Sequence, residues 1–345
     1  MKMTMKPTEN LSRDTEAVAD SLSAMMKREF TSYSCYDGYL NPSDPTMVTA
    51  DDRKKLVDWC YGVVDHCQLS RETVASAMEM VDRFLSMPSN SADAARVRNE
   101  ALRDQSKFQL LTIAALYSSI KVNERVALSS ELFSEICLRS YTAEEIEAME
   151  RTLLNGLSWR CNAPTAHQVG LSILSLILPY VDIPEVTWGF LMDEMKYLTE
   201  LAVQDYYFST QRMSTTALAA VFNVVNDTST KVRRQAIGAF LRVIMECFDF
   251  DDSEQINAAR RRLNFLAKPD TQEDEMMDDE ISLESLEESV ETIKASNSSS
   301  SHPKRGHEGH FWHEKDELGH EQVVSPSSSL RDISSEKQDS SLHFC

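Results

Sequence analysis

The chain has 345 residues, enough for about two domains and a tail, and its hydrophobic fraction of 42% can supply a sizeable core. Nine glycines and ten prolines are few, which favours long helices over a turn-rich β fold. The formal net charge of −20 argues against binding to a nucleic-acid backbone. Much of this charge lies in residues 269–345, which hold 6 Lys and Arg against 19 Asp and Glu.

The seven cysteines are odd in number, widely spaced and without a C-x-x-C pair. This pattern predicts reduced thiols in an intracellular protein rather than a disulfide framework or a zinc site. The first residues run into a polar stretch and form no signal-peptide core. The most apolar run, residues 171–178, is too short to cross a bilayer, so we expect no membrane partner.

Apolar residues recur at helical spacing through the first half of the chain. Helices are expected over about 17–30, 53–67 and 71–86, and the third carries a core-facing stripe formed by Val74, Ala77, Met78, Val81, Phe84 and Leu85. The polar segment 87–106 is predicted to be a long loop or a short exposed helix, most simply a surface insertion. The segment 108–120 is apolar nearly all round, as expected of a central buried helix.

The second half begins with a short helix over 130–138 and a longer one from Thr142, an N-cap with Glu145 as its capping-box partner. After a break at 158–165, further helices are expected at about 165–178, 184–204, 211–225, 230–248 and 253–266. Helices on both sides of the break suggest two similar domains, although no residue-level repeat proves it. The tail from residue 268 is acidic and then rich in Ser and His, and it is predicted to be disordered.

Catalytic patterns are not found in the sequence. It has no glycine-rich phosphate loop and no arrangement suggesting a Ser-His-Asp or Cys-His site. In the tail, His307, His310 and His313 could bind a metal if they were helical, but a solvated His-rich tail is the simpler interpretation. We therefore expect no cofactor and no metal, and a binding module rather than an enzyme.

The periodic segments resemble the cyclin box. The strings that carry the resemblance are Leu56-Val57-Asp58-Trp59, Val81 to Ser86, Phe108-Gln109-Leu110, Lys121 to Glu124, Tyr141-Thr142, Leu157-Ser158-Trp159 and Ala163-Pro164-Thr165. The string Asp205-Tyr206-Tyr207-Phe208 is similar to the second cyclin fold. The resemblance spans about residues 17–266, and the combined order and spacing of its strings is specific.

This resemblance implies an all-α protein with an N-terminal helix and two tandem five-helix cyclin folds, followed by a disordered acidic and Ser-rich tail. It divides the chain into an N-terminal arm, a cyclin box, a second cyclin fold and a regulatory tail, over residues 1–52, 53–162, 163–267 and 268–345.

The function implied is that of a non-catalytic subunit that binds and activates a cyclin-dependent Ser/Thr kinase as a heterodimer in cell-cycle control. In the family, the first fold presses on the regulatory helix of the kinase and completes its Lys–Glu ion pair. The box strings look closest to A-, B- and D-type members, and a location in the nucleus, the cytoplasm or both is expected.

Three alternatives stay open. The partner could be a transcriptional or metabolic kinase, or the chain could be a cyclin-fold adaptor that does not activate a kinase. A cyclin-fold protein that binds DNA or the transcription machinery needs basic faces, and the acidic body argues against it.

The kinase-binding residues implied by the resemblance are Lys121, Glu150, Val122, Leu154, Trp159 and Cys161. From the sequence alone, Lys121 and Glu150 would be two solvated surface charges, and the resemblance reverses that preference. For Leu154 and Trp159, ordinary core packing is about equally well supported. Arg53 and Asp82 align with an ion pair inside the first fold, and we expect their role to be structural.

Many cell-cycle cyclins also carry a groove that docks Arg-x-Leu motifs of substrates and inhibitors. Its counterparts here are Leu56, Trp59, Phe108 and Gln109, with Phe108 as a substitute. The groove is degenerate, because Asp52 and Lys55 replace apolar residues and Gly62 replaces the usual acid. We therefore predict weak or altered docking.

The tail contains short regulatory patterns. Ser325 precedes a proline, and Thr271 and Ser285 precede acids at the third position, so all three are possible phosphorylation sites. The acidic interval 268–294 resembles segments that mark unstable proteins for degradation, which implies contact with the ubiquitin-ligase machinery. Such short patterns also arise by chance in disordered tails.

Overall fold

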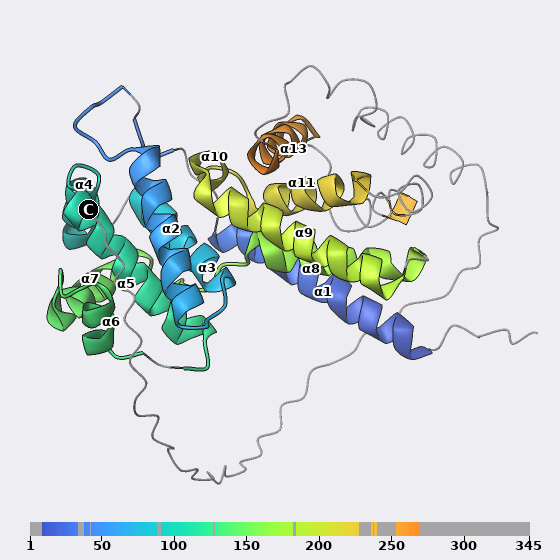
Figure 1. Cartoon of the computed structure of the whole chain (residues 1–345), viewed down its shortest axis with the longest axis horizontal. Helices are drawn as coiled ribbons and strands as arrows, with labels where there is room; N and C mark the ends of the chain where they lie inside the picture. The colour runs from blue at the N-terminus through green and yellow to red at the C-terminus, as the bar shows by residue number, and fades with distance from the viewer. Residues whose placement is uncertain are drawn as a thin grey trace, which may run out of the picture. The chain divides into compact units, whose positions relative to one another are not determined.

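The computed structural model describes residues 9–33, 38–41, 43–87, 91–126, 128–181, 184–227, 236, 238–239 and 253–268. Every regular element within these ranges is a helix, which confirms the all-α prediction (Figure 1). The buried apolar side chains form two separate clusters, one from α2 to α7 and the other from α8 to α13 with part of α1. The residue limits of the N-terminal arm, the cyclin box, the second cyclin fold and the tail stay a prediction.

The first bundle is built around one central helix. Its members are α2 (Ala50–His66), α3 (Glu72–Ser86), α4 (Ala92–Ala101), α5 (Gln105–Asn123), α6 (Ser130–Ile136) and α7 (Ala143–Gly156). In α5 every residue from Leu110 to Ile120 is buried, because α3, α4 and α7 all pack against it. This agrees with the apolar character expected of a central helix.

Local sequence fixes where three of the helices begin. Thr142 accepts a hydrogen bond from the backbone N–H of Glu145, whose side chain accepts one from Thr142 in return, so the predicted capping box is confirmed. The same reciprocal pairing occurs at Thr49 for α2 and at Thr165 for α8. Each box satisfies backbone donors that the first helical turn would leave unpaired.

The prediction for segment 87–106 is wrong in one respect, because its helix is not merely exposed. Ala94, Val97 and Ala101 of α4 are buried and pack toward α5 and α7. Their spacing of three and four places them on one helical face, although charged residues surround them in the sequence. The segment therefore contributes to the core of the first bundle and is not a surface insertion.

The second bundle surrounds another buried helix. Its described members are α8 (Ala166–Ile177), the short 3-10 helix η1 (Leu178–Tyr180), α9 (Glu185–Gln204), α10 (Tyr206–Ser209), α11 (Met213–Asn226) and α13 (Ser253–Ala267). Every residue of α11 from Ser214 to Val225 is buried, with α8, α9 and α13 against it. The expected helix at 230–248 lies largely outside the described residues, as does the tail from 269.

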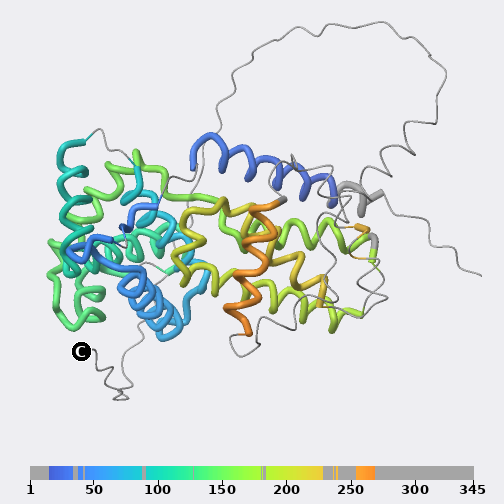
Figure 2. Tube along the Cα trace, turned by 90° about the horizontal axis from the view of Figure 1, so that it is seen from above, coloured from blue at the N-terminus to red at the C-terminus, as the bar shows by residue number. Residues whose placement is uncertain are grey.

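Helix α1 (Glu9–Ser32) is longer than the expected 17–30 and lies along the second bundle (Figure 2). It packs against α8, and its Leu22 is fully buried within the core of that bundle. The carboxylate of Glu29, itself buried, accepts a hydrogen bond of 2.9 Å from the backbone N–H of Ser214 at the start of α11. An acid at a helix N-terminus is favourable, so α1 is anchored at this end by charge as well as by packing.

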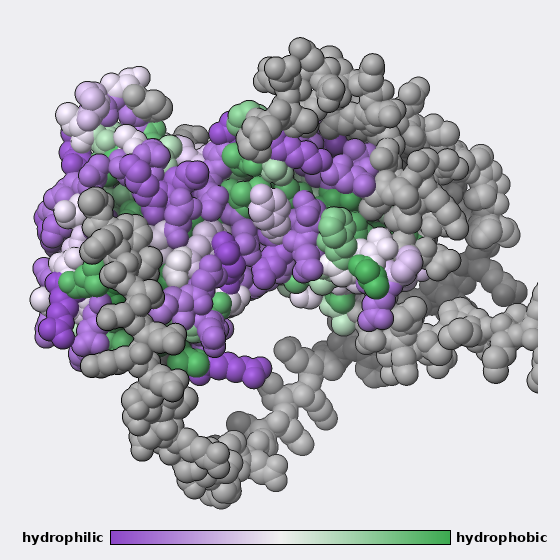
Figure 3. All heavy atoms as spheres, viewed as in Figure 1, coloured by the Kyte–Doolittle hydropathy of each residue, from purple (hydrophilic) through white to green (hydrophobic). Residues whose placement is uncertain are grey.

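The surface carries apolar residues on both bundles. On the face seen in Figure 3, hydrophilic side chains cover most of α2, and hydrophobic ones gather near α9 and α11. On α9, Val186 and Phe190 are 86% and 64% exposed. No described helix is long and apolar enough to span a membrane.

Candidate functional site

An ion pair between Lys121 and Glu150 joins the end of α5 to the middle of α7. The Lys121 Nζ lies 2.6 Å from the Glu150 carboxylate, which also accepts a hydrogen bond of 2.7 Å from the Ser118 hydroxyl. Glu150 is only 7% exposed, whereas the Lys121 side chain is 38% exposed. The interpretation of two solvated surface charges is therefore wrong for Glu150, which is buried and held in place.

Apolar side chains lie next to this pair in sequence and structure. Val122 follows Lys121 and is 45% exposed, while Leu154 lies one turn beyond Glu150 on α7 and is half-buried. Trp159 is 66% exposed, so core packing does not explain it. Together with the half-buried Cys161, these residues and the ion pair form what we call the α5–α7 surface.

The backbone after α7 turns Trp159 outward. Ser158 and Trp159 have φ angles of 51° and 60°, in the left-handed region that side chains other than glycine seldom adopt. The Trp159 backbone N–H donates to the Leu154 carbonyl at 2.8 Å, and its indole N–H donates to the Asn155 side chain at 3.2 Å. The indole is therefore held beside α7 with much of its ring in solvent.

Arg53 and Asp82 form the ion pair that was expected within the first bundle, and the contact extends further. The guanidinium donates to both Asp82 oxygens at 2.9 and 2.6 Å, and Tyr39 donates to the same carboxylate at 2.8 Å. A third guanidinium nitrogen donates to the Val203 carbonyl on α9 at 2.7 Å. Burial lowers the pKa of Arg53, but the Asp82 carboxylate outweighs it and the net shift is upward, so the cation is retained.

The residues expected to line a docking groove are not all at the surface. Leu56, Trp59 and Gln109 are half-buried, but Phe108 is 1% exposed and belongs to the core of the first bundle. The prediction that Phe108 substitutes in the groove is therefore wrong, because a partner cannot reach it. At Gly62 an added Cβ would meet no atom within 4 Å, so the position of the missing acid is open.

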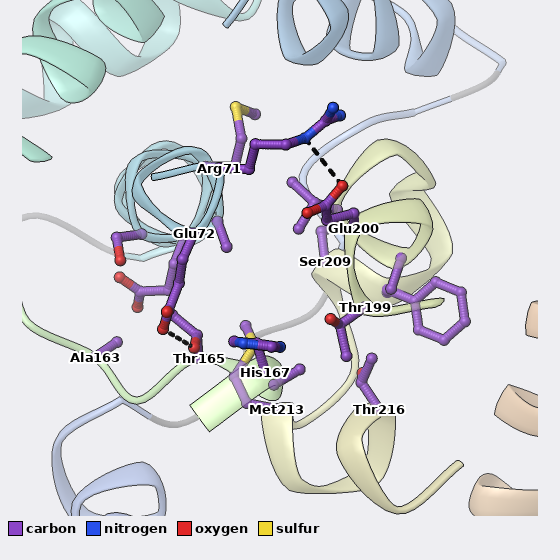
Figure 4. A pocket seen from close by; sticks show the side chains of 18 of the residues that line it. Arg71, Glu72, Ala163, Thr165, His167, Thr199, Glu200, Ser209, Met213 and Thr216 are labelled. Atoms are coloured by element: carbon purple, nitrogen blue, oxygen red, sulfur yellow. Dashed lines mark hydrogen bonds and ion pairs between the residues drawn. The ribbon is translucent and has the colours of Figure 1, made fainter. Parts of the chain in front are cut away.

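A pocket between the two bundles was not anticipated from the sequence. Figure 4 shows Glu72, Thr165 and His167 on one side of it and the ion pair of Arg71 with Glu200 on another. The Arg71 Nε lies 2.9 Å from Glu200, and Thr165 donates to Glu72 at 2.6 Å. No sequence signal could have revealed this pocket, because α3, α8 and α9 are far apart in the chain.

The possible metal ligands of the tail, His307, His310 and His313, lie outside the described residues. The described residues contain no group of three or more His, Cys, Asp or Glu side chains that could hold a metal ion. The possible phosphorylation sites Thr271, Ser285 and Ser325 lie outside the described residues.

Comparison with known proteins finds similarity to cyclins. Residues 20–162 match the model of the cyclin N-terminal domain. Cyclin-A2-1 of Oryza sativa subsp. japonica is 29% identical over 175 residues, which are 51% of this chain and 32% of that protein. G2/mitotic-specific cyclin C13-1 of Daucus carota is 28% identical over 159 residues, which are 46% of this chain and 42% of that protein. The matches thus span less than half of these two relatives.

The crystal structure of a viral cyclin from herpesvirus saimiri is similar in fold, with a TM-score of 0.51 and 13% sequence identity. The match covers 72% of this chain and 97% of the viral one, and at this identity it shows the fold alone. The molecule is thus an all-helical protein with the cyclin fold. Over residues 20–162 the chain is similar to the cyclin N-terminal domain, and A-type and B-type cyclins are among the proteins that it resembles.

Proposed function

We propose that this chain is a regulatory subunit that binds and activates a cyclin-dependent Ser/Thr protein kinase in cell-cycle control, and that it catalyses no reaction itself. The observation that carries the proposal is the α5–α7 surface, where a buried carboxylate and a half-exposed ammonium lie beside exposed apolar side chains. The similarity of residues 20–162 to the cyclin N-terminal domain supports a kinase as the partner.

The composition of this surface suits an interface. Energetically important interface residues are enriched in Trp, which fits the exposed Trp159 on this surface. Because Ser118 and Lys121 already hold the Glu150 carboxylate, little side-chain freedom remains to be lost when a partner binds. Lys121 keeps donor capacity for backbone carbonyls of the partner, since an ammonium has three N–H groups.

Activation would follow from selective binding. A subunit that binds the active arrangement of a kinase more tightly than the inactive one shifts the population toward the active state, and it needs no catalytic residue of its own. An adaptor with the same fold would bind without such a preference. The two functions therefore differ in one measurable respect, the activity of the bound kinase.

The remaining parts of the proposal rest on the sequence. Substrates or inhibitors could bind near Leu56 and Trp59, and the tail could contact the ubiquitin-ligase machinery. We place the complex in the nucleus, the cytoplasm or both, and expect neither nucleic acid nor membrane as a partner. A transcriptional or metabolic kinase is the alternative partner.

Reconstitution tests the proposal. The purified chain is mixed with individual cyclin-dependent kinases, and bound kinase and its activity on a histone substrate are measured. The double variant Lys121→Ala/Glu150→Ala is compared with Glu135→Ala/Arg139→Ala, which removes an exposed pair 3.3 Å apart elsewhere on the first bundle. Circular dichroism verifies that both variants fold.

We expect the wild type and the control variant to activate at least one cell-cycle kinase, and the α5–α7 variant to fail. Binding without activation would favour the adaptor, and activation restricted to a transcriptional kinase would favour the alternative partner. Equal activation by both double variants would contradict the role of this surface.

A further inference from the structure

The pocket between the bundles is close in volume to cavities that hold a single-ring molecule. It has a volume of about 130 Å³ and draws its lining from α2, α3, α8, α9, α10, α11 and the segments before α3 and α8. Cavities of roughly 150 Å³ in protein interiors hold a benzene molecule. Ligand pockets occur preferentially at interfaces between domains, and this pocket lies where two hydrophobic cores meet.

The walls are largely apolar. Apolar contributions come from both bundles and from the segment that joins them, through Met78, Ala163, Pro164, Val203, Phe208 and Met213. Such walls would hold a hydrocarbon ring, and a small number of polar groups would then decide its orientation and its chemistry.

Three hydroxyl groups of the pocket present acceptors rather than donors. The hydroxyls of Thr199, Ser209 and Thr216 donate to the backbone carbonyls three or four residues earlier, at 2.8, 2.8 and 3.3 Å. Each hydroxyl has one donor and two acceptor positions. Because each hydroxyl proton is already donated to a backbone carbonyl, these side chains offer a ligand only oxygen lone pairs.

His167 and Glu72 add two stronger acceptors on one side of the pocket (Figure 4). The Nδ1 atom of His167 is buried and has no hydrogen-bond partner among the described residues. Burial lowers the pKa of His167 and outweighs the opposing effect of Glu72, which favours a neutral imidazole. One oxygen of Glu72 accepts the Thr165 hydroxyl at 2.6 Å, so the carboxylate is fixed in position.

The cations at the pocket already have carboxylate neighbours. Arg71 Nε lies 2.9 Å from Glu200, and Lys196 Nζ lies 4.0 Å from the same carboxylate. A ligand that brought its own negative charge would compete with Glu200 and would meet Glu72. The polar groups therefore favour a ligand that donates hydrogen bonds and carries a positive charge.

We propose that this pocket binds a small organic amine, with a single hydrophobic ring between the apolar walls and its ammonium between Glu72 and His167. An ammonium has three N–H donors and no acceptor, which matches a carboxylate, an unpartnered imidazole nitrogen and a hydroxyl oxygen. Because the pocket is lined by both bundles, a bound amine stabilises their observed arrangement.

Titration of the full chain with benzylamine tests the proposal, with benzyl alcohol as the matched probe that lacks the ammonium. Methionine methyl groups labelled with ¹³C give a local readout, since Met78 and Met213 line the pocket and Met149 lies in the core of the first bundle. Affinities come from the dependence of the Met78 and Met213 signals on probe concentration.

We expect saturable benzylamine binding that shifts the Met78 and Met213 signals and leaves Met149 in place. Affinity for benzyl alcohol should be lower by about tenfold or more, since a hydrogen bond to a charged group is worth about 1.5–3 kcal/mol. Glu72→Gln should weaken benzylamine by a similar factor, and the exposed control Glu131→Gln should not.

Three results would overturn the proposal: no saturable binding of benzylamine, equal affinity for the two probes, or unchanged benzylamine affinity in Glu72→Gln. Ala75→Leu, which adds bulk to the lining, should also abolish binding while circular dichroism shows a folded chain. Retained binding in a folded Ala75→Leu variant would place the amine elsewhere and equally contradict the assignment. Because no kinase is present, these outcomes do not depend on the proposed function.

Discussion

The Arg53 guanidinium donates two hydrogen bonds to the Asp82 carboxylate, at 2.9 and 2.6 Å, although it is 2% exposed. Through its third nitrogen the same group donates to Val203 on α9. One buried cation therefore links two helices of the first bundle to a helix of the second. Breaking such a buried pair should destabilise the fold more than breaking an exposed pair.

Removing one member of this pair should be costly. Asp82→Ala leaves a buried guanidinium without its counter-charge and should lower the free energy of unfolding by about 3–5 kcal/mol. Asp51→Ala, which breaks an exposed pair with Lys55, should cost less than about 1 kcal/mol. Urea unfolding followed by circular dichroism compares the two variants, and equal losses would mean that the buried pair is not structural.

The burial of Phe108 predicts a stability effect rather than a docking effect. Phe108→Ala should lower the free energy of unfolding by about 3–5 kcal/mol, because it opens a cavity in the core of the first bundle. Replacing the half-buried Trp59 by alanine should lower the free energy of unfolding by less. Urea unfolding of both variants checks this order. An unchanged free energy of unfolding for Phe108→Ala would contradict the assignment of Phe108 to the core.

Two glycines should respond to alanine with opposite signs. Gly62 lies within α2 with open space around it, so Gly62→Ala should raise the free energy of unfolding by about 0.5–1 kcal/mol. At Gly156 an added Cβ would lie 2.5 Å from the Phe84 ring, so Gly156→Ala should lower it by about 1–3 kcal/mol. The midpoints of urea unfolding provide the comparison, and a stabilised Gly156→Ala would show that the ring can move away.

The pocket histidine predicts a dependence of stability on pH. Burial lowers the pKa of His167 from its ordinary value of 6.5, with Glu72 opposing and Lys196 adding to the effect. The unfolded chain therefore takes up this proton at a higher pH than the folded chain does. Stability from the neutral imidazole is present above pH 6.5 and is lost as the pH falls through the folded pKa.

The variant His167→Gln has no proton to gain at this position. Between about pH 7.5 and pH 5.5, the free energy of unfolding should fall more for the wild type than for His167→Gln. Urea unfolding at both pH values measures the difference. Equal losses in the two chains would show that His167 does not titrate differently on folding.

Sequence patterns predicted the features that depend on interactions between neighbouring residues. The capping box at Thr142 and the all-apolar run at 108–120 depend on residues a few positions apart, and both appear in the structure as expected. The buried face of α4 had a signal too, since Ala94, Val97 and Ala101 follow helical spacing. Small side chains among charged ones obscured it.

Residue spacing could not predict contacts between segments that are far apart in the chain. Lys121 and Glu150 are 29 residues apart, and only resemblance to a family brought them together before the structure did. The link from Arg53 to Val203 spans 150 residues and depends on how the two bundles pack. The pocket at Glu72 and His167 has the same origin, and no single segment encodes it.

Titration calorimetry of the wild type, Trp159→Ala and Phe190→Ala with a cell-cycle cyclin-dependent kinase tests whether the α5–α7 surface binds the kinase. Both replaced side chains are aromatic and about two-thirds exposed, so neither change should unfold the chain. We expect Trp159→Ala to weaken binding by about tenfold or more, as for an interface anchor, and Phe190→Ala to bind as tightly as the wild type. Equal affinities for all three chains, or a loss confined to Phe190→Ala, would contradict binding at this surface.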